Sequence, residues 1–269
     1  LLKEELTRFG SLIMEAAHAT RVPAGSALAV DRELFSDYIT EKIRNDPDIE
    51  VINEEAVSVK EGEMNIIATG PLTSEGMSDF IKDGLGCGSL HFFDAAAPIV
   101  DFDSINTDVA FFASRYGKGN PEDYLNCPMT KEQYDAFYNA LITAEEAELK
   151  DFDKDLKVFE GCMPVEVMAR RGFDTLRYGP LKPVGLTDPN TGKEPYAVVQ
   201  LRQDNAAKSV FNLVGFQTHL KFGEQKRVFS MIPALKNAEY VRYGVMHQNT
   251  FIQSPKLLDK YYADRRNPL

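Results

Sequence analysis

The sequence predicts a mixed α/β protein of two lobes, the first acidic and the second basic. Helical spacing of apolar residues alternates with short strand-like runs up to residue 160, and strand-like runs dominate after residue 172. With 269 residues, 43% of them hydrophobic, the chain can bury the core of one large domain or two smaller ones. Residues 1–160 hold 14 Lys and Arg against 32 Asp and Glu, whereas residues 161–269 hold 16 against 9.

The composition argues against a membrane protein, a secreted protein and a disulfide-rich protein. No run approaches the roughly 18 apolar residues that cross a bilayer, and no signal pattern opens the chain, so we expect a cytoplasmic protein without a membrane partner. The three cysteines, Cys87, Cys127 and Cys162, fit neither a disulfide framework nor a metal site, and reduced thiols are expected. Leu1 stands inside a helical pattern without a preceding methionine, which suggests an internal fragment.

The first predicted elements are a helix and short strands. Asp31 is a candidate N-cap for a helix with apolar residues at helical spacing, and Asn45-Asp46-Pro47 ends it. The stretch "IEVINEEAVSVKEGEMNIIATG" predicts two strands, a turn at Gly62, and a buried strand over residues 65–68 that leads into Thr69-Gly70. Ala68, Thr69 and Gly70 leave room for a ligand near the backbone, although an ordinary tight turn is the favoured interpretation.

The later elements are a capped helix and a β-rich half. "LHFFDAAAPIV" predicts a strand, and Thr130 with Gln133 predicts a capping box at the start of a helix. "DPNTGKEP" predicts a turn, "YAVVQLRQ" and "FNLVGFQTHL" predict strands, and "GEQKRVFSMI" predicts a short helix that carries Lys226 and Arg227.

Cys162, in the stretch "GCMPVEVMARRG", is the first candidate for a catalytic residue. Pro164 suits a first helical turn and Gly172 a left-handed C′ position, which places Cys162 at or just before the N-cap. A helix N-terminus lowers a thiol pKa and favours a nucleophilic thiolate. A buried cysteine that acts as a small hydrophobe is the commoner alternative.

His247 is the second candidate, in "VRYGVMHQNTF". Arg242, Tyr243, Gln248 and Asn249 surround it in sequence, and such aromatic and amide groups suit a flat heterocycle. A strand end satisfied by its neighbours explains the pattern equally well. The four histidines are too scattered for a metal set, so no metal is expected, and the chain contains neither G-x-G-x-x-G nor G-x-x-x-x-G-K-[ST].

Several long stretches together resemble one family. These are "FGSLIMEAAHATRVPAGSALAVDR", "IIATGPLTS", "FFDAAAPIV", "YLNCPMT", "FEGCMPVEVMARRG", "YGPLKPVGL", "PYAVVQLRQDNAA", "NLVGFQTHLKFGEQKRVF" and "YVRYGVMHQNTFIQSPKLL". They resemble the folate- and FAD-dependent tRNA (uracil-5-)-methyltransferases, the TrmFO family, and cover nearly the whole chain in order. The resemblance implies an internal fragment, without the family's N-terminal dinucleotide motif and C-terminal flavin segment.

The resemblance also implies an architecture. We expect a partial FAD-binding domain, Rossmann-like and similar to glucose-inhibited division protein A, with an inserted α+β domain. Residues 1–98 correspond to the partial FAD-binding domain. Residues 99–238 correspond to the RNA-facing insertion domain, and residues 239–269 return to the FAD-binding domain.

The function implied by the resemblance is formation of 5-methyluridine in the T-loop of tRNA. Methylenetetrahydrofolate is the carbon donor, reduced FAD the reductant, and NAD(P)H the expected source of electrons. By family matching, Cys162 is the catalytic nucleophile, His247 stacks on folate with Arg242 nearby, and Ala68, Thr69 and Gly70 lie beside FAD.

The RNA-binding candidates are Arg170, Arg171, Lys226 and Arg227, chosen from charge and helix placement. A solvated helix face explains any one of them as well. Two alternative functions stay open: 23S rRNA uracil-C5 methylation by the same chemistry, and a noncatalytic RNA-binding fragment.

Overall fold

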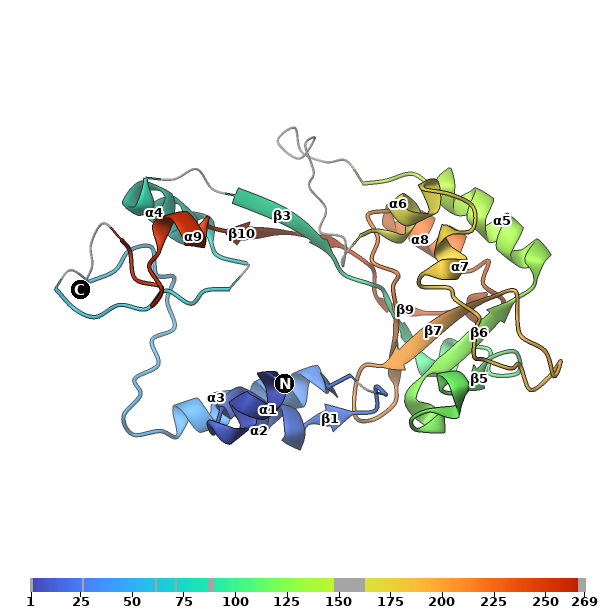
Figure 1. Ribbon diagram of the computed structural model, residues 1–269, viewed down its shortest axis with the longest axis horizontal. Coiled ribbons are helices and arrows are strands. Elements are labelled where there is room, and N and C mark those ends of the chain that lie inside the picture. Colours follow the sequence, from blue (N-terminus) through green and yellow to red (C-terminus); the bar gives the residue numbers. More distant parts are fainter. Residues whose placement is uncertain are drawn as a thin grey trace. The chain divides into compact units, whose positions relative to one another are not determined.

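The computed structural model describes residues 2–25, 27–60, 62–70, 72–86, 90–147 and 163–265, without the side chains of residues 90–95, 246–248 and 250. Cys87 and Cys162 therefore lie outside the described residues. The chain divides into two compact units (Figure 1). The first comprises the described residues of Leu1–Val51, Ala95–Glu148 and Met163–Val245, and the second those of Ile52–Asp94 and Met246–Leu269.

The first unit opens with helices joined by a small antiparallel pair of strands. Asp31 caps the longest of these helices, since its side chain accepts hydrogen bonds from the amides of Glu33 and Leu34 at 3.1 Å. Asn45 is the C-cap. Both predicted ends of this helix are thus confirmed. The elements are α1 Leu2–Arg8, α2 Leu12–Ala19, β1 Arg21–Val22, β2 Ala29–Val30 and α3 Arg32–Arg44.

A six-stranded antiparallel sheet forms the centre of the first unit, in the strand order β5-β6-β7-β8-β4-β9. The strand β7 lies inside it, where Leu201 pairs with Leu125 on one side and Leu213 on the other. The strands are β4 Ile99–Asp101, β5 Phe111–Phe112, β6 Leu125–Met129, β7 Ala197–Gln203, β8 Val210–Leu213 and β9 Tyr240–Arg242.

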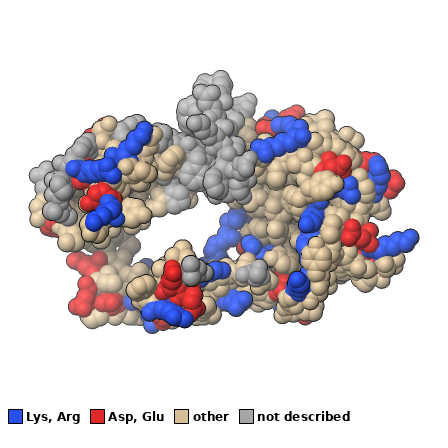
Figure 2. All heavy atoms as spheres, in the orientation of Figure 1, with Lys and Arg blue, Asp and Glu red and all other residues tan. Residues whose placement is uncertain are grey.

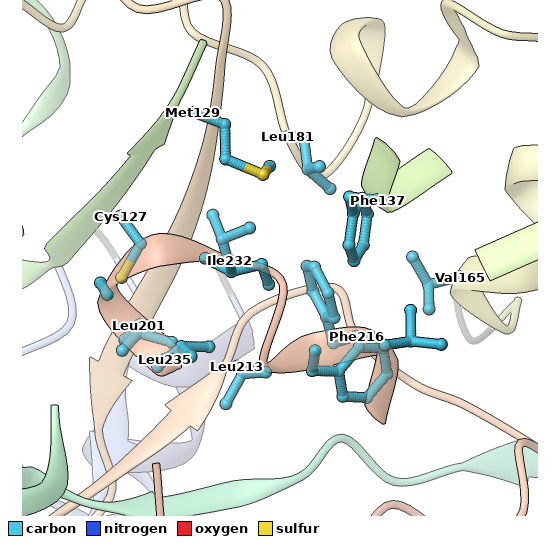
Figure 3. Close-up of a cluster of buried hydrophobic side chains, with 14 of the residues drawn as sticks. Cys127, Met129, Phe137, Val165, Leu181, Leu201, Leu213, Phe216, Ile232 and Leu235 are labelled. Carbon is cyan, nitrogen blue, oxygen red and sulfur yellow. The ribbon is translucent and has the colours of Figure 1, made fainter. Parts of the chain in front are cut away.

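Four helices contribute to the main core against this sheet (Figures 1 and 3). Phe137, Phe216 and Phe229 are fully buried, and the ring of Phe216 meets that of Phe229 edge-on at 5.2 Å. Thr130 and Gln133 form the predicted capping box of α5. The helices are α5 Lys131–Ile142, α6 Val165–Arg170, α7 Thr175–Tyr178 and α8 Phe222–Phe229, and the 3-10 turns are η1 Phe102–Ser104, η2 Arg115–Gly117, η3 Pro121–Asp123 and η6 Pro233–Leu235.

The structure of the β-rich second half agrees with most of the elements that the sequence predicts. Residues 188–193 form the predicted turn, because Asp188 bridges to Lys193 and Gly192 has a φ of +67°. Both predicted strands are confirmed as β7 and β8, although β8 ends at Leu213 and residues 214–219 continue without strand structure. The predicted short helix is α8.

The second unit contains α4 Glu75–Leu85, the paired strands β3 Leu90–Ala95 and β10 Met246–Phe251, and α9 Ser254–Leu257. The turn at Gly62 is confirmed by its φ of +78°. The strands predicted on either side of it are wrong: the described residues from 51 to 70 form none, and Ile66 is 85% exposed. A strand needs partners to pair its backbone, and none of the described strands pairs with this segment.

Phe216→Ala is expected to lower the free energy of unfolding by about 3–5 kcal/mol, because it leaves a cavity between Phe137 and Phe229. Urea denaturation followed by far-ultraviolet circular dichroism measures the loss. The control is Tyr178→Ala, which removes a ring that is 83% exposed and should change stability by no more than about 0.5 kcal/mol. Equal losses in the two variants would contradict this description of the core.

Candidate functional site

The segment after Cys162 is the best-defined part of the predicted site. Met163 and Pro164 are buried, Pro164 is the N-cap of α6, and the amide of Val165 donates a 2.7 Å hydrogen bond to the carbonyl of Gln217. Cys162 therefore precedes the N-cap by two residues, one more than the sequence pattern suggests. The first amide of α6 already has a carbonyl partner, so it does not serve a thiolate.

A buried carboxylate, Glu166, anchors α6 to the segment after β8. Its two oxygens accept hydrogen bonds from the Thr218 hydroxyl at 2.9 Å and from the His219 amide at 2.7 Å. The side chain is fully buried, and burial raises the pKa of Glu166, while these hydrogen bonds oppose the rise. Sequence reasoning missed this residue, because a glutamate within a short amphipathic helix resembles an ordinary solvent-facing one.

Arg242 lies in a group of charged side chains that are distant in sequence. Arg32 donates to Asp204 at 2.9 Å, and Arg202 and Arg242 also act on the pKa of this carboxylate, which burial raises. Burial and the neighbouring Arg32 lower the pKa of Arg242. We call Arg32, Arg202, Arg242, Asp204 and the neighbouring Asp31 the arginine cluster. Three cations and two carboxylates leave one positive charge, which suits an anionic ligand.

The other predicted cofactor residues lie in the second unit. His247 belongs to β10, which pairs with β3, but its side chain is outside the described part of the structure. Ala68, Thr69 and Gly70 are exposed. The hydroxyls of Thr69 and Thr73 are 2.7 Å apart, and Thr73 also donates to the Gly70 carbonyl at 2.8 Å. The described residues 68–70 form neither a helix nor a strand, and both interpretations of the sequence, a ligand near the backbone and a tight turn, stay predictions.

The glycine of this stretch, Gly70, is accessible, but the described residues do not enclose it. Gly70 has a φ of +73°, and a Cβ built there would meet nothing within 4 Å. A flat ring could approach the backbone at this point. The described residues supply no wall around such a ring, so they do not by themselves fit a bound flavin.

The four RNA-binding candidates lie on α6 and α8. Arg170 pairs with Glu146, and Arg227 makes two hydrogen bonds to Glu224, at 2.8 and 2.6 Å. Arg171 and Lys226 are exposed, and among the described residues no ion pair involves Lys226. On the face drawn in Figure 2, basic and acidic side chains are interspersed rather than gathered by sign. Arg170 and Arg227 are therefore neutralised locally by carboxylates.

The described cysteine is Cys127, in β6. It is a free, fully buried thiol among the apolar side chains of Figure 3, and burial raises the pKa of Cys127 to about 12. This thiol is chemically inert at neutral pH. Within the described ranges, no three His, Cys, Asp or Glu side chains gather as a metal site, and none of the helices found there is long and apolar enough to span a membrane.

The fold and the comparisons define the class of protein. Residues 1–269 match the family described as Glucose inhibited division protein A (GidA), and the chain belongs to this family. The structure is similar to Aquifex aeolicus GidA in its form II crystal, with a TM-score of 0.59 and 14% identity, over 93% of this chain and 48% of that one. The mixed α/β fold is thus shared with GidA.

Within this family the chain is similar to the enzymes named Methylenetetrahydrofolate--tRNA-(uracil-5-)-methyltransferase TrmFO. It is 62% identical over 268 residues to that of Acetivibrio thermocellus and 60% identical to that of Natranaerobius thermophilus. Both alignments cover 100% of this chain and 61% of the relative, so the chain spans about three fifths of the length of these proteins. The resemblance seen in the sequence is confirmed.

Glu166→Gln is expected to gain stability relative to the wild type as the pH rises above the ordinary glutamate value of 4.5. Because the folded state holds the Glu166 proton more tightly, the wild type loses stability between 4.5 and its raised folded-state pKa, and glutamine has no proton to lose. Urea denaturation of both proteins between pH 4 and 8 measures the difference. The exposed Glu5→Gln change is the control, and a difference independent of pH would contradict the burial of this carboxyl.

Proposed function

We propose that the complete protein to which this chain belongs is a folate- and FAD-dependent methyltransferase that forms 5-methyluridine in the T-loop of tRNA. The observation that carries the proposal is about 60% identity, along the whole chain, to relatives named for this reaction. Because tRNA and reduced folates are intracellular, the proposal implies a cytoplasmic enzyme. The proposed architecture is a Rossmann-like FAD-binding domain, residues 1–98 and 239–269, with an insertion domain at residues 99–238.

The proposed role of Cys162 is nucleophilic. Its thiolate forms a bond to C6 of uracil, and the electron pair of the C5–C6 double bond moves toward C5 and O4 as an enolate. The carbon nucleophile at C5 then attacks the one-carbon unit, and the bond between this carbon and the nitrogen that carries it breaks, with its electron pair left on the nitrogen. Loss of the C5 proton and departure of the thiolate restore the C5–C6 double bond. The target base must leave its stack to reach the sulfur.

The cofactors supply the carbon and the electrons of the proposed reaction. When bound, methylenetetrahydrofolate provides the methylene carbon, and reduced FAD provides the reducing equivalents that convert it to a methyl group, with NAD(P)H as the proposed source of electrons. We assign Ala68, Thr69 and Gly70 to the flavin side of the site. The open backbone at Gly70 supports this assignment, although the walls of a flavin site must come from other residues.

The folate assignment rests on His247 and Arg242. The imidazole of His247 would stack on the pterin ring, and Arg242 would pair with a carboxylate of the folate tail. The positive charge of the arginine cluster supports an anionic ligand beside Arg242. Arg32 and Arg202 belong to the same arginine cluster of the first unit, although they come from distant parts of the chain.

The RNA-facing surface is proposed to include Arg170, Arg171, Lys226 and Arg227. Arg170 and Arg227 must give up their ion pairs with glutamates before they can contact phosphate, and this exchange reduces what each arginine contributes to the free energy of RNA binding. Lys226 needs no such exchange with a described residue, so it is the strongest of the four. The same chemistry on 23S rRNA is the alternative that a substrate comparison tests.

Cys162→Ala in the complete protein is expected to abolish transfer of label from methylene-labelled folate to tRNA that lacks 5-methyluridine. The loss should be at least about 10³-fold, the order seen when a covalent nucleophile is removed. The control is Cys127→Ala, which removes the inert buried thiol and should retain activity per folded molecule. Full activity of Cys162→Ala would refute the nucleophile, and labelling of 23S rRNA instead of tRNA would refute the substrate.

The visible absorption of this chain with and without added FAD is the companion measurement. A flavin spectrum that survives gel filtration would show that the chain completes a cofactor site. A colourless protein that still binds tRNA would favour the noncatalytic RNA-binding alternative for the isolated chain.

Arg242→Gln is expected to raise the KM for methylenetetrahydrofolate by about tenfold, the loss of one charge-assisted hydrogen bond of about 1.4 kcal/mol. The KM for tRNA should stay within about twofold. Steady-state kinetics of the complete protein with each substrate varied in turn measures both. Lys226→Gln is the comparison variant and should show the reverse pattern. A rise confined to the KM for tRNA in Arg242→Gln would move this arginine to the RNA surface.

A further inference from the structure

A buried glutamine, Gln225 of α8, is bonded to the chain just before His247. Its side-chain nitrogen donates to the Gly244 carbonyl at 2.8 Å, and its side-chain oxygen accepts from the Gly244 amide at 2.8 Å. The same nitrogen donates to the Leu220 carbonyl at 2.7 Å. Gln225 is fully buried, and both N–H groups of its amide are used. The side chain of Gln225 therefore holds both backbone polar groups of Gly244, its N–H and its carbonyl.

Gly244 is packed so closely by its neighbours that no residue with a Cβ fits at this position. A Cβ at Gly244 would lie 2.5 Å from the Thr218 methyl carbon and 2.9 Å from the Ala96 carbonyl oxygen. The preceding Tyr243 is held between two rings, with centroids 5.0 Å from those of Phe222 and Tyr240. Phe222 and Gln225 both come from α8, so one helix holds residues 243 and 244 by stacking and by hydrogen bonds.

The same network reaches the helix that follows Cys162. Thr218 accepts from the Leu220 amide at 3.1 Å and donates to Glu166 of α6. Leu220 in turn bonds Gln225 through its carbonyl. A continuous set of buried polar contacts thus runs from Glu166 through Thr218, Leu220 and Gln225 to Gly244. The chain leaves it at Met163 toward Cys162 and at Val245 toward His247.

We propose that Glu166, Thr218 and Gln225 are positioning residues, which hold α6 and Gly244 of the first unit in a fixed relation on which methyl transfer depends. This inference rests on the proposed function. An apolar core would also bury these segments, but it would tolerate small sliding of one past another. Directional hydrogen bonds between buried groups do not, because a shift leaves a donor or acceptor unpaired. Displacing a reacting group by 1 Å can cost about 10²-fold in rate.

The first experiment compares Gln225→Leu with Asn126→Leu in the complete protein. Asn126 is the matched control, since it is also fully buried and its amide donates to three backbone carbonyls, but it lies in β6 outside the network. Both substitutions are expected to lower the thermal midpoint. Only Gln225→Leu is expected to lower kcat for methyl transfer, by at least tenfold per folded molecule, and to change the rate at which iodoacetamide alkylates Cys162.

A milder pair of variants keeps the test decisive if Gln225→Leu does not fold. Thr218→Val keeps the shape of the side chain but removes the hydroxyl that joins Glu166 to the Leu220 amide, whereas Thr218→Ser keeps the hydroxyl. We expect Thr218→Val to lose at least fivefold in kcat and Thr218→Ser to retain it within twofold.

The outcomes separate the positioning role from the proposed function. An active parent enzyme with unchanged kcat in both Gln225→Leu and Thr218→Val overturns the positioning role alone. An equal loss of kcat in Asn126→Leu also overturns it, because general destabilisation then explains the effect. A parent protein with bound flavin and folate that transfers no methyl group overturns the proposed function, and the positioning role with it.

Discussion

The first unit depends on the burial of β7 on both faces. Ala197, Val199 and Leu201 point into the main core, while Val198 packs with Phe111 and Leu186 on the other face. A strand covered on both sides and paired on both edges cannot shift its register without exposing apolar side chains or breaking its ladders. Pairing with β7 sets the registers of β6 and β8. The helices α5, α6 and α8 contribute side chains to the same core as β7.

Buried hydrogen bonds restrict the backbone of the first unit further than its apolar core does. Glu166 and Gln225 are fully buried, and each bonds backbone groups that no strand ladder or helix satisfies. Such groups are costly when unpaired, so they fix the paths of residues 217–220 and 244 more tightly than packing alone. The segments that adjoin both predicted chemical residues are therefore ordered by the same few hydrogen bonds.

Charge is distributed in two different ways on the first unit. Around α6 and α8, Glu145, Glu146 and Glu224 pair with nearby cations, so the basic character of these two helices is partly compensated. In the arginine cluster, Asp204 bonds Arg32 and interacts electrostatically with Arg202 and Arg242, and the formal charges of the cluster sum to one positive charge. Net charge along the sequence therefore indicated a basic region but not where an anion would be attracted.

The sequence by itself determined the local elements and the family. Asp31, Thr130 with Gln133, and the turn at residues 188–193 carry their signals within a few residues, so their structures followed directly. The long stretches around Cys162 and His247 identified the relatives. The strands expected around Gly62 were wrong, because hydrophobic alternation predicts a strand only where other strands exist to pair with it.

Only the tertiary structure decided which distant residues meet. The arginine cluster joins residues about 170 to 210 positions apart, and the contacts of Glu166 and Gln225 depend on how α6 and α8 lie against the segments after β8 and β9. Nothing local distinguishes these side chains from solvated ones. Their burial and partners are set by long-range packing, which short sequence patterns do not encode.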